Sequence, residues 1–350
     1  MRDGNKRLKF AVKYTMEEGE SNMTEVRFYD KVEDSLLRFA VIIARSGDKW
    51  VFCKHRERNT YEVPGGHREP GENIDDTARR ELYEETGALR YTLQPICVYS
   101  VTAPDNFDGQ ESFGMLYYAQ IEEFEPELHS EIEKIILTAE LPECWTYPEI
   151  QPKLLAELER RRILNNIRFE KLTPLMADDF LHYFENEAFP ENDSRSCCFC
   201  LESHLPNESE YTAIEDRREK ARELILKGIM TGYLIYDNNH VIGWCNTGDK
   251  TDYLPIYEND EFRTDDERGK VKVLYCIDIA PNYQGKGIAN IIMEKVLSDA
   301  KEEGYSYVEG YPFVDTDFVW QYHGPVRLYE KYGFEMYGKK SWFYIMRKAL

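Results

Sequence analysis

Three glutamates, with an arginine beside them, are spaced so that their carboxylates could hold a divalent cation. Glu81, Glu84 and Glu85 fall within the segment Arg80–Gly87, which reads RELYEETG. At about 100° per residue, these three positions share one narrow face of a helix. They lie toward its C-terminal end, where the helix dipole disfavours anions. A solvated face explains such a placement poorly, whereas a bound Mg²⁺ would offset the repulsion because it takes oxygen ligands.

The sequence also delimits the helix that must position these glutamates. Asn73 is a suitable N-cap, and Asp75 and Asp76 occupy the first turn, where negative charge is favoured. Gly87 is the expected glycine after the last helical turn. Arg80 would orient the glutamates without binding the metal itself, and Glu72 could add another oxygen from the preceding loop.

These residues belong to a longer pattern. Gly66, five residues, Glu72, seven residues and then Arg80–Gly87 resemble the signature of the Nudix hydrolases, and Val63-Pro64-Gly65 before it also fits. The one departure is Ala88, where a larger aliphatic residue is usual. The resemblance implies an α/β/α sandwich over about residues 1–160 and hydrolysis of a nucleoside diphosphate linked to another moiety, with Mg²⁺ or Mn²⁺.

The same resemblance assigns roles to individual side chains. It implies that Glu81, Glu84 and Glu85 bind the metal, with Glu81 and Glu84 catalytic and Glu81 the preferred base for the attacking water. Gly66, Glu72, Arg80 and Gly87 would support the site. Candidates for substrate choice, each also common on surfaces or in cores, are Arg56, Arg58, Tyr61 and Glu111. The pattern looks most like the nucleoside-triphosphate-cleansing members of the 8-oxo-dGTP type, and no coenzyme A pyrophosphatase motif is found.

A second candidate site is a glycine loop between a predicted strand and a predicted helix. Gly285 and Gly287 would let backbone N–H groups converge on an anion at the helix N-terminus. No Gly-Lys-Ser/Thr ends the loop and no third spaced glycine follows, so two other nucleotide-binding motifs are absent. Gln284-Gly-Lys-Gly-Ile-Ala289 instead resembles a hallmark of the GNAT acetyltransferases, and Arg327–Phe334, RLYEKYGF, resembles their second hallmark.

The GNAT resemblance covers residues 166–350 and implies acetyl transfer from acetyl-CoA to an amine. The backbone of Ile277, Asp278 and Ile279 would bind the pantetheine arm, and the pyrophosphate would lie against Gln284, Gly285, Lys286, Gly287, Ile288 and Ala289. Tyr329 stands where the family often places a general acid; the alternative is a core tyrosine packed on Phe334. Tyr322-His-Gly-Pro325 replaces the family's usual Asn, and the general base is left open between Asp278, Glu309 and a water relay.

A cysteine cluster near the start of the second half has no clear chemistry. Cys197, Cys198, Cys200 and His204 lie close in sequence, but their spacing fits a closed zinc site poorly. We expect buried thiols or part of the acceptor pocket rather than a metal site.

Chain length and net charge limit the number of domains and the classes of function that are possible. A chain of 350 residues with 42% hydrophobic residues predicts two domains, placed at 1–164 and 165–350. A net charge of −21 argues against binding a nucleic-acid polymer. The absence of a signal peptide, of a membrane span and of a disulfide-like cysteine pattern predicts a cytoplasmic protein.

Both halves alternate predicted helices and strands, which indicates a two-domain mixed α/β protein. In the first half we expect strands at 39–44, 50–53, 62–63, 93–101 and 113–121, and helices from 74 and over 149–162. In the second half we expect strands at 167–170, 232–237, 240–246, 271–279 and 307–314, and helices at 176–187, 211–227, 288–303 and 326–331. The GNAT resemblance implies a central, mostly antiparallel sheet there.

The sequence therefore predicts a bifunctional enzyme, a nucleotide hydrolase fused to an acetyltransferase, with independent sites. The rival interpretation is a nucleotide- or acyl-CoA-sensing protein in which one domain is not catalytic.

Overall fold

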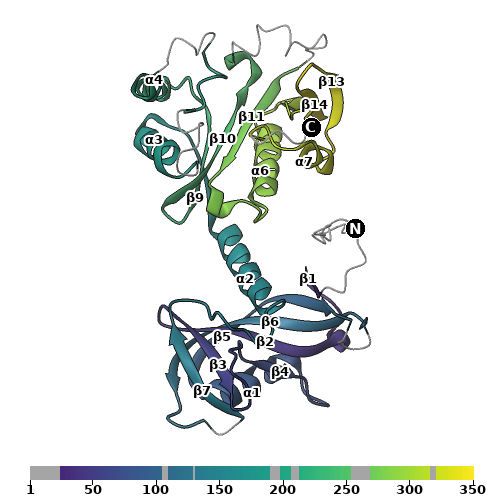
Figure 1. Cartoon of the computed structure of the whole chain (residues 1–350). Coiled ribbons are helices and arrows are strands. Elements are labelled where there is room, and N and C mark those ends of the chain that lie inside the picture. The colour runs from purple at the N-terminus through teal and green to yellow at the C-terminus, as the bar shows by residue number, and fades with distance from the viewer. Residues whose placement is uncertain are drawn as a thin grey trace. The chain divides into compact units, whose positions relative to one another are not determined.

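The structure, a computed structural model, describes residues 24–104, 109–128, 131–189, 198–205, 213–253, 269–315 and 321–350 (Figure 1). The chain divides into two compact units, Met1–Arg161 and Arg162–Leu350. The division falls inside helix α2 (Gln151–Asn166).

The first unit is built on one mixed sheet. Its strand order is β1-β5-β6-β2-β3-β7, and β4 pairs with β2. β2 and β6 are parallel, whereas the other pairs are antiparallel. The strands are β1 (Glu25–Tyr29), β2 (Leu37–Ser46), β3 (Lys49–His55), β4 (Gly65–His67), β5 (Ala88–Thr102), β6 (Ser112–Phe124) and β7 (Ile132–Thr138).

Alternation along β2 divides the apolar side chains between two cores. Ile42 packs in a buried cluster with Ala78 and Leu82 of α1 (Ile74–Thr86). The next residue, Ile43, lies in the opposite cluster with Leu154 of α2. Successive side chains of a strand point to opposite faces, so each face of the sheet is covered by one helix. The predicted α/β/α sandwich is confirmed.

The ends of α1 are those predicted from the sequence. Asn73 accepts a hydrogen bond from the Asp76 amide at 2.9 Å, and Gly87 adopts φ 69° and ψ 24° as the C-cap. The predicted strand at 62–63 is wrong. Glu62 makes only an isolated bridge to Cys53, and β4 begins at Gly65, because the intervening Pro64 has no N–H with which to extend a ladder.

The second unit carries a sheet of order β13-β14-β12-β11-β10-β9-β8. Only β11 and β12 are parallel, so the predicted mostly antiparallel sheet is confirmed. The strands are β8 (Ile167–Lys171), β9 (Gly232–Asp237), β10 (His240–Asp249), β11 (Val271–Ile279), β12 (Tyr307–Gly310), β13 (Glu335–Lys339) and β14 (Tyr344–Ala349).

Helices cover both faces of this second sheet (Figure 1). α3 (Ala177–Asn186) and α4 (Ile214–Leu226) contribute Phe180 and Leu224 to one buried cluster. α6 (Ile288–Glu302) and α7 (Val326–Lys331) contribute Ile292 and Leu328 to the other. The start of the helix expected at 211 lies outside the described residues.

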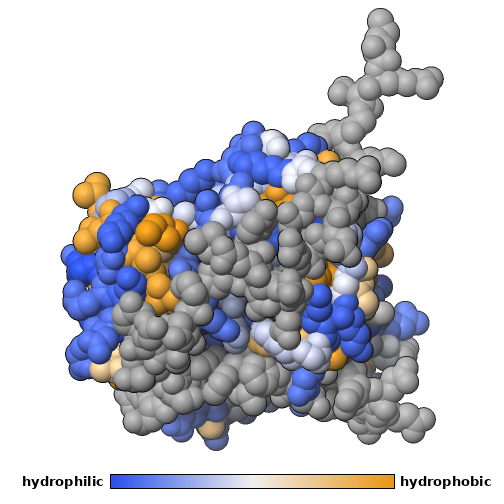
Figure 2. Space-filling view, turned by 90° about the horizontal axis from the view of Figure 1, so that it is seen from above, coloured by the Kyte–Doolittle hydropathy of each residue, from blue (hydrophilic) through white to orange (hydrophobic). Residues whose placement is uncertain are grey.

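The described part of the face seen in Figure 2 is largely hydrophilic, with hydrophobic areas between hydrophilic ones. Among the described residues, no helix is both long and apolar enough to cross a membrane.

Candidate functional site

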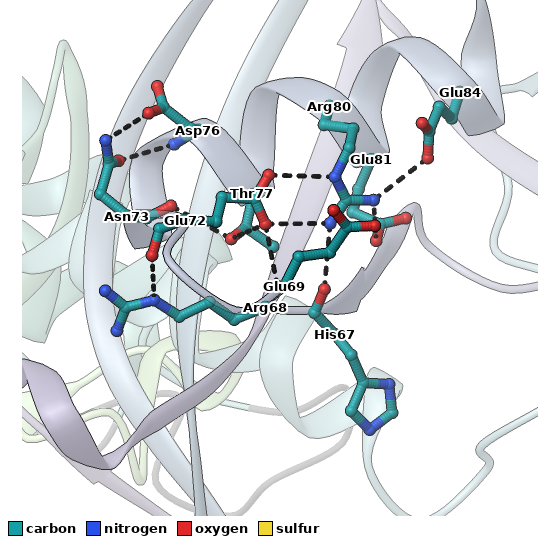
Figure 3. Close-up of polar contacts among 10 residues, drawn as sticks. All are labelled: His67, Arg68, Glu69, Glu72, Asn73, Asp76, Thr77, Arg80, Glu81 and Glu84. Atoms are coloured by element: carbon teal, nitrogen blue, oxygen red, sulfur yellow. Dashed lines mark hydrogen bonds and ion pairs between the residues drawn. The ribbon is translucent and has the colours of Figure 1, made fainter.

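Arg80 stands at the centre of the acidic cluster on α1 (Figure 3). Its Nε and Nη2 donate to the two carboxylate oxygens of Glu72 at 3.0 and 3.1 Å. Its Nη1 donates to Glu81 at 2.7 Å and to Glu84 at 3.1 Å. This hydrogen bonding by Arg80 lowers the pKa of Glu72 to about 2. One guanidinium thus orients three of the predicted carboxylates.

Glu85 is half-buried and bonds to the backbone where β4 begins. Its carboxylate accepts a hydrogen bond from the Gly65 amide at 2.9 Å. Burial, with added repulsion from Glu81, raises the pKa of Glu85 to about 8 despite that hydrogen bond. Burial also raises the pKa of Glu81, which Arg80 only partly offsets. Both carboxylates therefore lie where negative charge is incompletely compensated.

Gly66 allows β4 to pass directly over Glu81. A methyl group added at Gly66 would overlap the Glu81 carboxylate, which Arg80 holds in place. At Gly65 an added methyl would lie 2.9 Å from the backbone Cα of Val41, in addition to overlapping the Ala40 carbonyl. The two glycines thus bring β4 close to both β2 and α1.

The chemistry of this donor set fits a hard divalent cation. Glu81, Glu84 and Glu85 supply carboxylate oxygens, the ligands that Mg²⁺ and Mn²⁺ prefer. The undercompensated charge of Glu81 and Glu85 is what a cation would neutralise. Arg80 is bound to Glu81 and Glu84. Among the described residues, no group of three Asp, Glu, His or Cys side chains is arranged so that it could already hold a metal ion.

The four candidates for substrate choice occupy separate surroundings. Arg58 pairs with Glu62 at 3.3 Å, and Glu111 accepts from Tyr29 at 2.6 Å and from Ser100 at 2.7 Å. Tyr61 bonds through its amide to the Cys144 carbonyl. Arg56 lines an open groove together with Lys134 and Glu125.

In the second unit, the glycine loop has the predicted backbone form. Gly285 and Gly287 adopt φ 72° and 89°, in the left-handed region that glycine tolerates without strain. Gly287 is the N-cap of α6, and no side chain caps this helix. Gln284 folds back and donates to the Ile279 carbonyl at 2.8 Å. The first-turn amides of α6 therefore have no competing side-chain anion or hydroxyl.

The pairing of β11 with β12 ends at Leu274. Their parallel register ends with Leu274 opposite Gly310, and the Ile277 amide then donates to the Tyr322 carbonyl at 2.7 Å. The chain's own Tyr322 thus occupies the backbone position predicted for a pantetheine arm at Ile277. A ligand that bonds this amide must displace the Tyr322 carbonyl.

Tyr329 is fully buried on α7. Its ring packs edge-on against Phe334 at 5.2 Å between centroids, and its hydroxyl donates to the His323 carbonyl. Burial raises the pKa of Tyr329 well above its usual value, which keeps the phenol protonated. Tyr329 therefore carries a proton, which in this structure is donated to the His323 carbonyl in a hydrogen bond.

The two acids considered as bases differ in their surroundings. Glu309 is fully buried and accepts from Arg347 at 2.9 Å, Lys250 at 3.0 Å and Tyr311 at 2.8 Å. Glu309 is thus fully buried and already bonded to three donors, so it offers no exposed oxygen to a substrate amine. Asp278 is half-buried and accepts a hydrogen bond from Tyr183 of α3. Asp278 is the better candidate of the two.

Cys198 and Cys200 are free thiols, and Cys197 lies outside the described residues. Cys200 accepts a hydrogen bond from Asn246 Nδ2 at 3.0 Å, and the same amide contacts Ser203 at 2.8 Å. His204 lies at the edge of this group, 3.5 Å from Asn246 Nδ2, and burial lowers its pKa to about 4.

Comparison with known proteins assigns both units. The NUDIX domain model matches residues 35–166, and the model of the acetyltransferase (GNAT) family matches residues 197–334. A Bacillus subtilis (strain 168) protein named "Putative 8-oxo-dGTP diphosphatase YtkD" is 31% identical over 131 residues, which are 37% of this chain and 80% of that protein. The chain belongs to the NUDIX family, and it also contains a GNAT acetyltransferase domain.

Solved structures of a pyrophosphohydrolase and of an acetyltransferase are also similar to parts of the chain. The pyrophosphohydrolase BsRppH of Bacillus subtilis is 28% identical, with 39% of this chain and 90% of that chain covered and a TM-score of 0.34. An acetyltransferase from Thermus thermophilus is 12% identical, with 53% and 97% covered and a TM-score of 0.33.

The NUDIX domain brings two further carboxylates toward the cluster that the sequence did not single out. Glu62 and Glu131 both add to the repulsion that raises the pKa of Glu85. Glu62 is itself buried, and burial raises its pKa. Glu62 lies one residue from the predicted Tyr61, whereas nothing local in the sequence marks Glu131.

Gly66→Ala is expected to lower any nucleotide hydrolysis by the NUDIX domain roughly ten- to a hundredfold, because the new methyl displaces the Glu81 carboxylate. The control is Gly71→Ala, whose methyl meets no atom within 4 Å but whose φ of 85° strains any other residue. Steady-state hydrolysis and urea unfolding of both variants measure the difference. If Gly71→Ala loses as much activity as Gly66→Ala, general destabilisation accounts for the loss and Glu81 does not.

Proposed function

We propose that the chain is a bifunctional enzyme in which the NUDIX domain hydrolyses a nucleoside di- or triphosphate-type substrate, of the 8-oxo-dGTP type. The observation that carries this is the carboxylate cluster of α1, with its charge incompletely compensated at Glu81 and Glu85. The likeness to YtkD, which extends over 80% of that protein, supports the choice of substrate. We assign residues 1–164 to this domain and 165–350 to the GNAT domain.

In this proposal each residue of the cluster has a defined role. Glu81, Glu84 and Glu85 would hold Mg²⁺ or Mn²⁺, and Glu81 also takes the proton of the attacking water. Arg80 fixes Glu81 and Glu84, and its ion pair with Glu72 anchors the guanidinium. Gly66 and Gly87 shape the chain around α1. When bound, the cation would supply charge neutralisation on the phosphates and a more acidic water.

The test of hydrolysis is a screen of nucleoside di- and triphosphates, 8-oxo-dGTP among them, with Mg²⁺ and the full chain. The proposal predicts a nucleoside monophosphate product for the preferred substrate and its loss in Glu84→Gln. A variant as fast as the wild type would remove Glu84 from the metal site. Tight binding of a nucleotide without turnover would instead establish the sensor interpretation.

We propose that the GNAT domain transfers an acetyl group from acetyl-CoA to an amine. The amine nitrogen attacks the thioester carbonyl, the C–S bond breaks, and the leaving thiolate takes a proton from the Tyr329 hydroxyl. The α6 N-terminus and the loop Gln284–Ala289 would hold the pyrophosphate, and Ile277–Ile279 the pantetheine arm. Asp278 would receive the proton of the amine.

Tyr329→Phe is expected to lower acetyl transfer roughly a hundredfold, because a positioned general acid contributes about that much. Tyr332→Phe is the matched control, since Tyr332 lies next to α7 and its hydroxyl donates to the Asn290 carbonyl and to Glu294. Release of CoA thiol with a panel of amines measures both. Equal rates for Tyr329→Phe and wild type would leave Tyr329 as a core residue.

A further inference from the structure

A short turn before α7 takes up two of the groups that the proposed acetyl transfer needs. The Tyr322 carbonyl accepts a hydrogen bond from the Ile277 amide at 2.7 Å, where the pantetheine arm is expected. The His323 carbonyl accepts the hydrogen bond of the Tyr329 hydroxyl, which is the proposed general acid. A proton donated to a backbone carbonyl is not available to a departing thiolate. Neither group can therefore act while residues 321–324 keep this position.

The His323 side chain fastens the same turn to β11. Its Nδ1 bonds to the Tyr275 carbonyl, and Nδ1 must carry the proton because a carbonyl only accepts. Nε2 then holds the lone pair, and it is buried without a hydrogen-bond partner among the described residues. Burial lowers the pKa of His323 to about 4, so the ring stays neutral. This unsatisfied acceptor is a cost of the present position, and exposure of the ring to water would remove it.

Aromatic packing and one glycine complete the turn. The His323 ring packs against Tyr322 and Phe313, at 4.3 and 4.8 Å between ring centroids. Gly324 has φ of 78°, in the left-handed region, and its amide donates to the Gln321 carbonyl at 2.9 Å. A methyl added at Gly324 would come no closer than 3.4 Å to its nearest neighbour. A larger residue there would strain the backbone of the turn without a steric clash.

We propose that residues 321–324 form an autoinhibitory strap that closes the acetyl-CoA site of the GNAT domain. Its role rests on the proposed acetyl transfer, which places the pantetheine arm at Ile277 and the acid at Tyr329. In the closed form the strap bonds to both groups. Acetyl-CoA binds when the strap moves away, so that the pantetheine arm takes the Ile277 amide and the Tyr329 hydroxyl is released.

Such a strap sets the observed affinity for CoA. When only a fraction of the molecules is open, the apparent dissociation constant rises in inverse proportion to that fraction. A change that raises the free energy of the closed form alone therefore tightens CoA binding. A turn with a purely structural role would not give tighter binding when its backbone is strained.

Gly324→Ala tests the strap in the full chain, with CoA as the probe. Isothermal titration calorimetry should show CoA binding roughly tenfold tighter than in the wild type, because alanine disfavours the left-handed backbone of the closed turn. Gly304→Ala is the matched control. Gly304, beyond the C-terminal end of α6, has φ of 75°, and an added methyl meets no atom of the described residues within 4 Å. It carries the same backbone strain and should leave CoA affinity unchanged, with circular dichroism to show that both variants are folded.

Hydrogen–deuterium exchange of the wild type is a second test that needs no substitution. CoA should speed exchange in 321–324, because these residues give up their backbone contacts, and slow it in 285–290 at the start of α6. Slower exchange in 321–324 with CoA, or a Gly324→Ala protein that binds CoA no more tightly than the wild type, would overturn the strap. CoA that opens the strap without acetyl transfer to any amine would refute only the proposed activity. Failure of both proteins to bind CoA would overturn the strap and the activity together.

Discussion

Glu85→Gln is expected to lower Mg²⁺-dependent nucleotide hydrolysis by roughly a hundred- to a thousandfold, because it removes one anionic ligand from a cation that supplies several kcal/mol of transition-state stabilisation. The same change is expected to stabilise the metal-free NUDIX domain. The neutral amide keeps an oxygen for the Gly65 amide, and it avoids the cost of either ionising or protonating the buried Glu85 carboxyl beside Glu81 and Glu62 on folding.

The stability effect of Glu85→Gln has a defined pH window. The pKa of Glu85 is raised from 4.5 to about 8 in the folded chain, so the folded state binds more protons than the unfolded state between these values. The free energy of unfolding of the metal-free wild type therefore falls as pH rises through this window. The gain on substitution should be near zero below the window and about 3 kcal/mol at neutral pH.

Urea unfolding at several pH values, in a chelator, measures this gain. Glu84→Gln is the matched control, because the Glu84 side chain is 47% exposed and its loss should change stability little. A metal-free Glu85→Gln protein less stable than the wild type at neutral pH would show that the charge of Glu85 is satisfied without a cation.

Glu309→Gln is expected to destabilise the GNAT domain by roughly 3 kcal/mol, because removing one member of a buried ion pair leaves its partners undercompensated. Glu309 is fully buried and joins Lys250 of one loop to Arg347 of β14. Arg347 also stacks over Tyr337, at 4.1 Å from the ring centroid, so its displacement would disturb β13 as well.

The control for Glu309→Gln is Glu170→Gln on β8 of the same sheet. The Glu170 side chain is 46% exposed and pairs with Arg168, and exposed pairs contribute at most about 1 kcal/mol. Denaturant unfolding of the two variants gives the comparison. Unchanged stability together with lost acetyl transfer in Glu309→Gln would instead make Glu309 the base and exclude Asp278 from that role.

Local sequence signals predicted most elements of the fold. Alternation along β2, the Asn73 cap and Gly87 each determine structure within a few residues. β1 and β7 were not predicted, because they are edge strands with few buried residues and depend on pairing with β5 and β3. The strand expected at 62–63 failed because Pro64 interrupts it.

The site residues could be predicted only where they lie close together in the sequence. The spacing of Gly66, Glu72 and the α1 glutamates predicted one cluster. Glu131 is distant from them in sequence and comes near the cluster only because the chain folds. In the GNAT domain, a register shift opposite Tyr275 places Tyr275 and Cys276 in the same buried cluster. Strict alternation would put them on opposite faces, so neither this shared burial nor the difference between Asp278 and Glu309 could be read from the sequence.

The central claim, that the α1 carboxylates form a cation site, is tested most directly by hydrogen–deuterium exchange of α1 with and without Mg²⁺. We predict that Mg²⁺ slows exchange in 74–86 in the wild type and has no such effect in Glu85→Gln, because ligand binding to the folded state stabilises it. Equal protection by Mg²⁺ in the two proteins, or none in the wild type, would contradict the account.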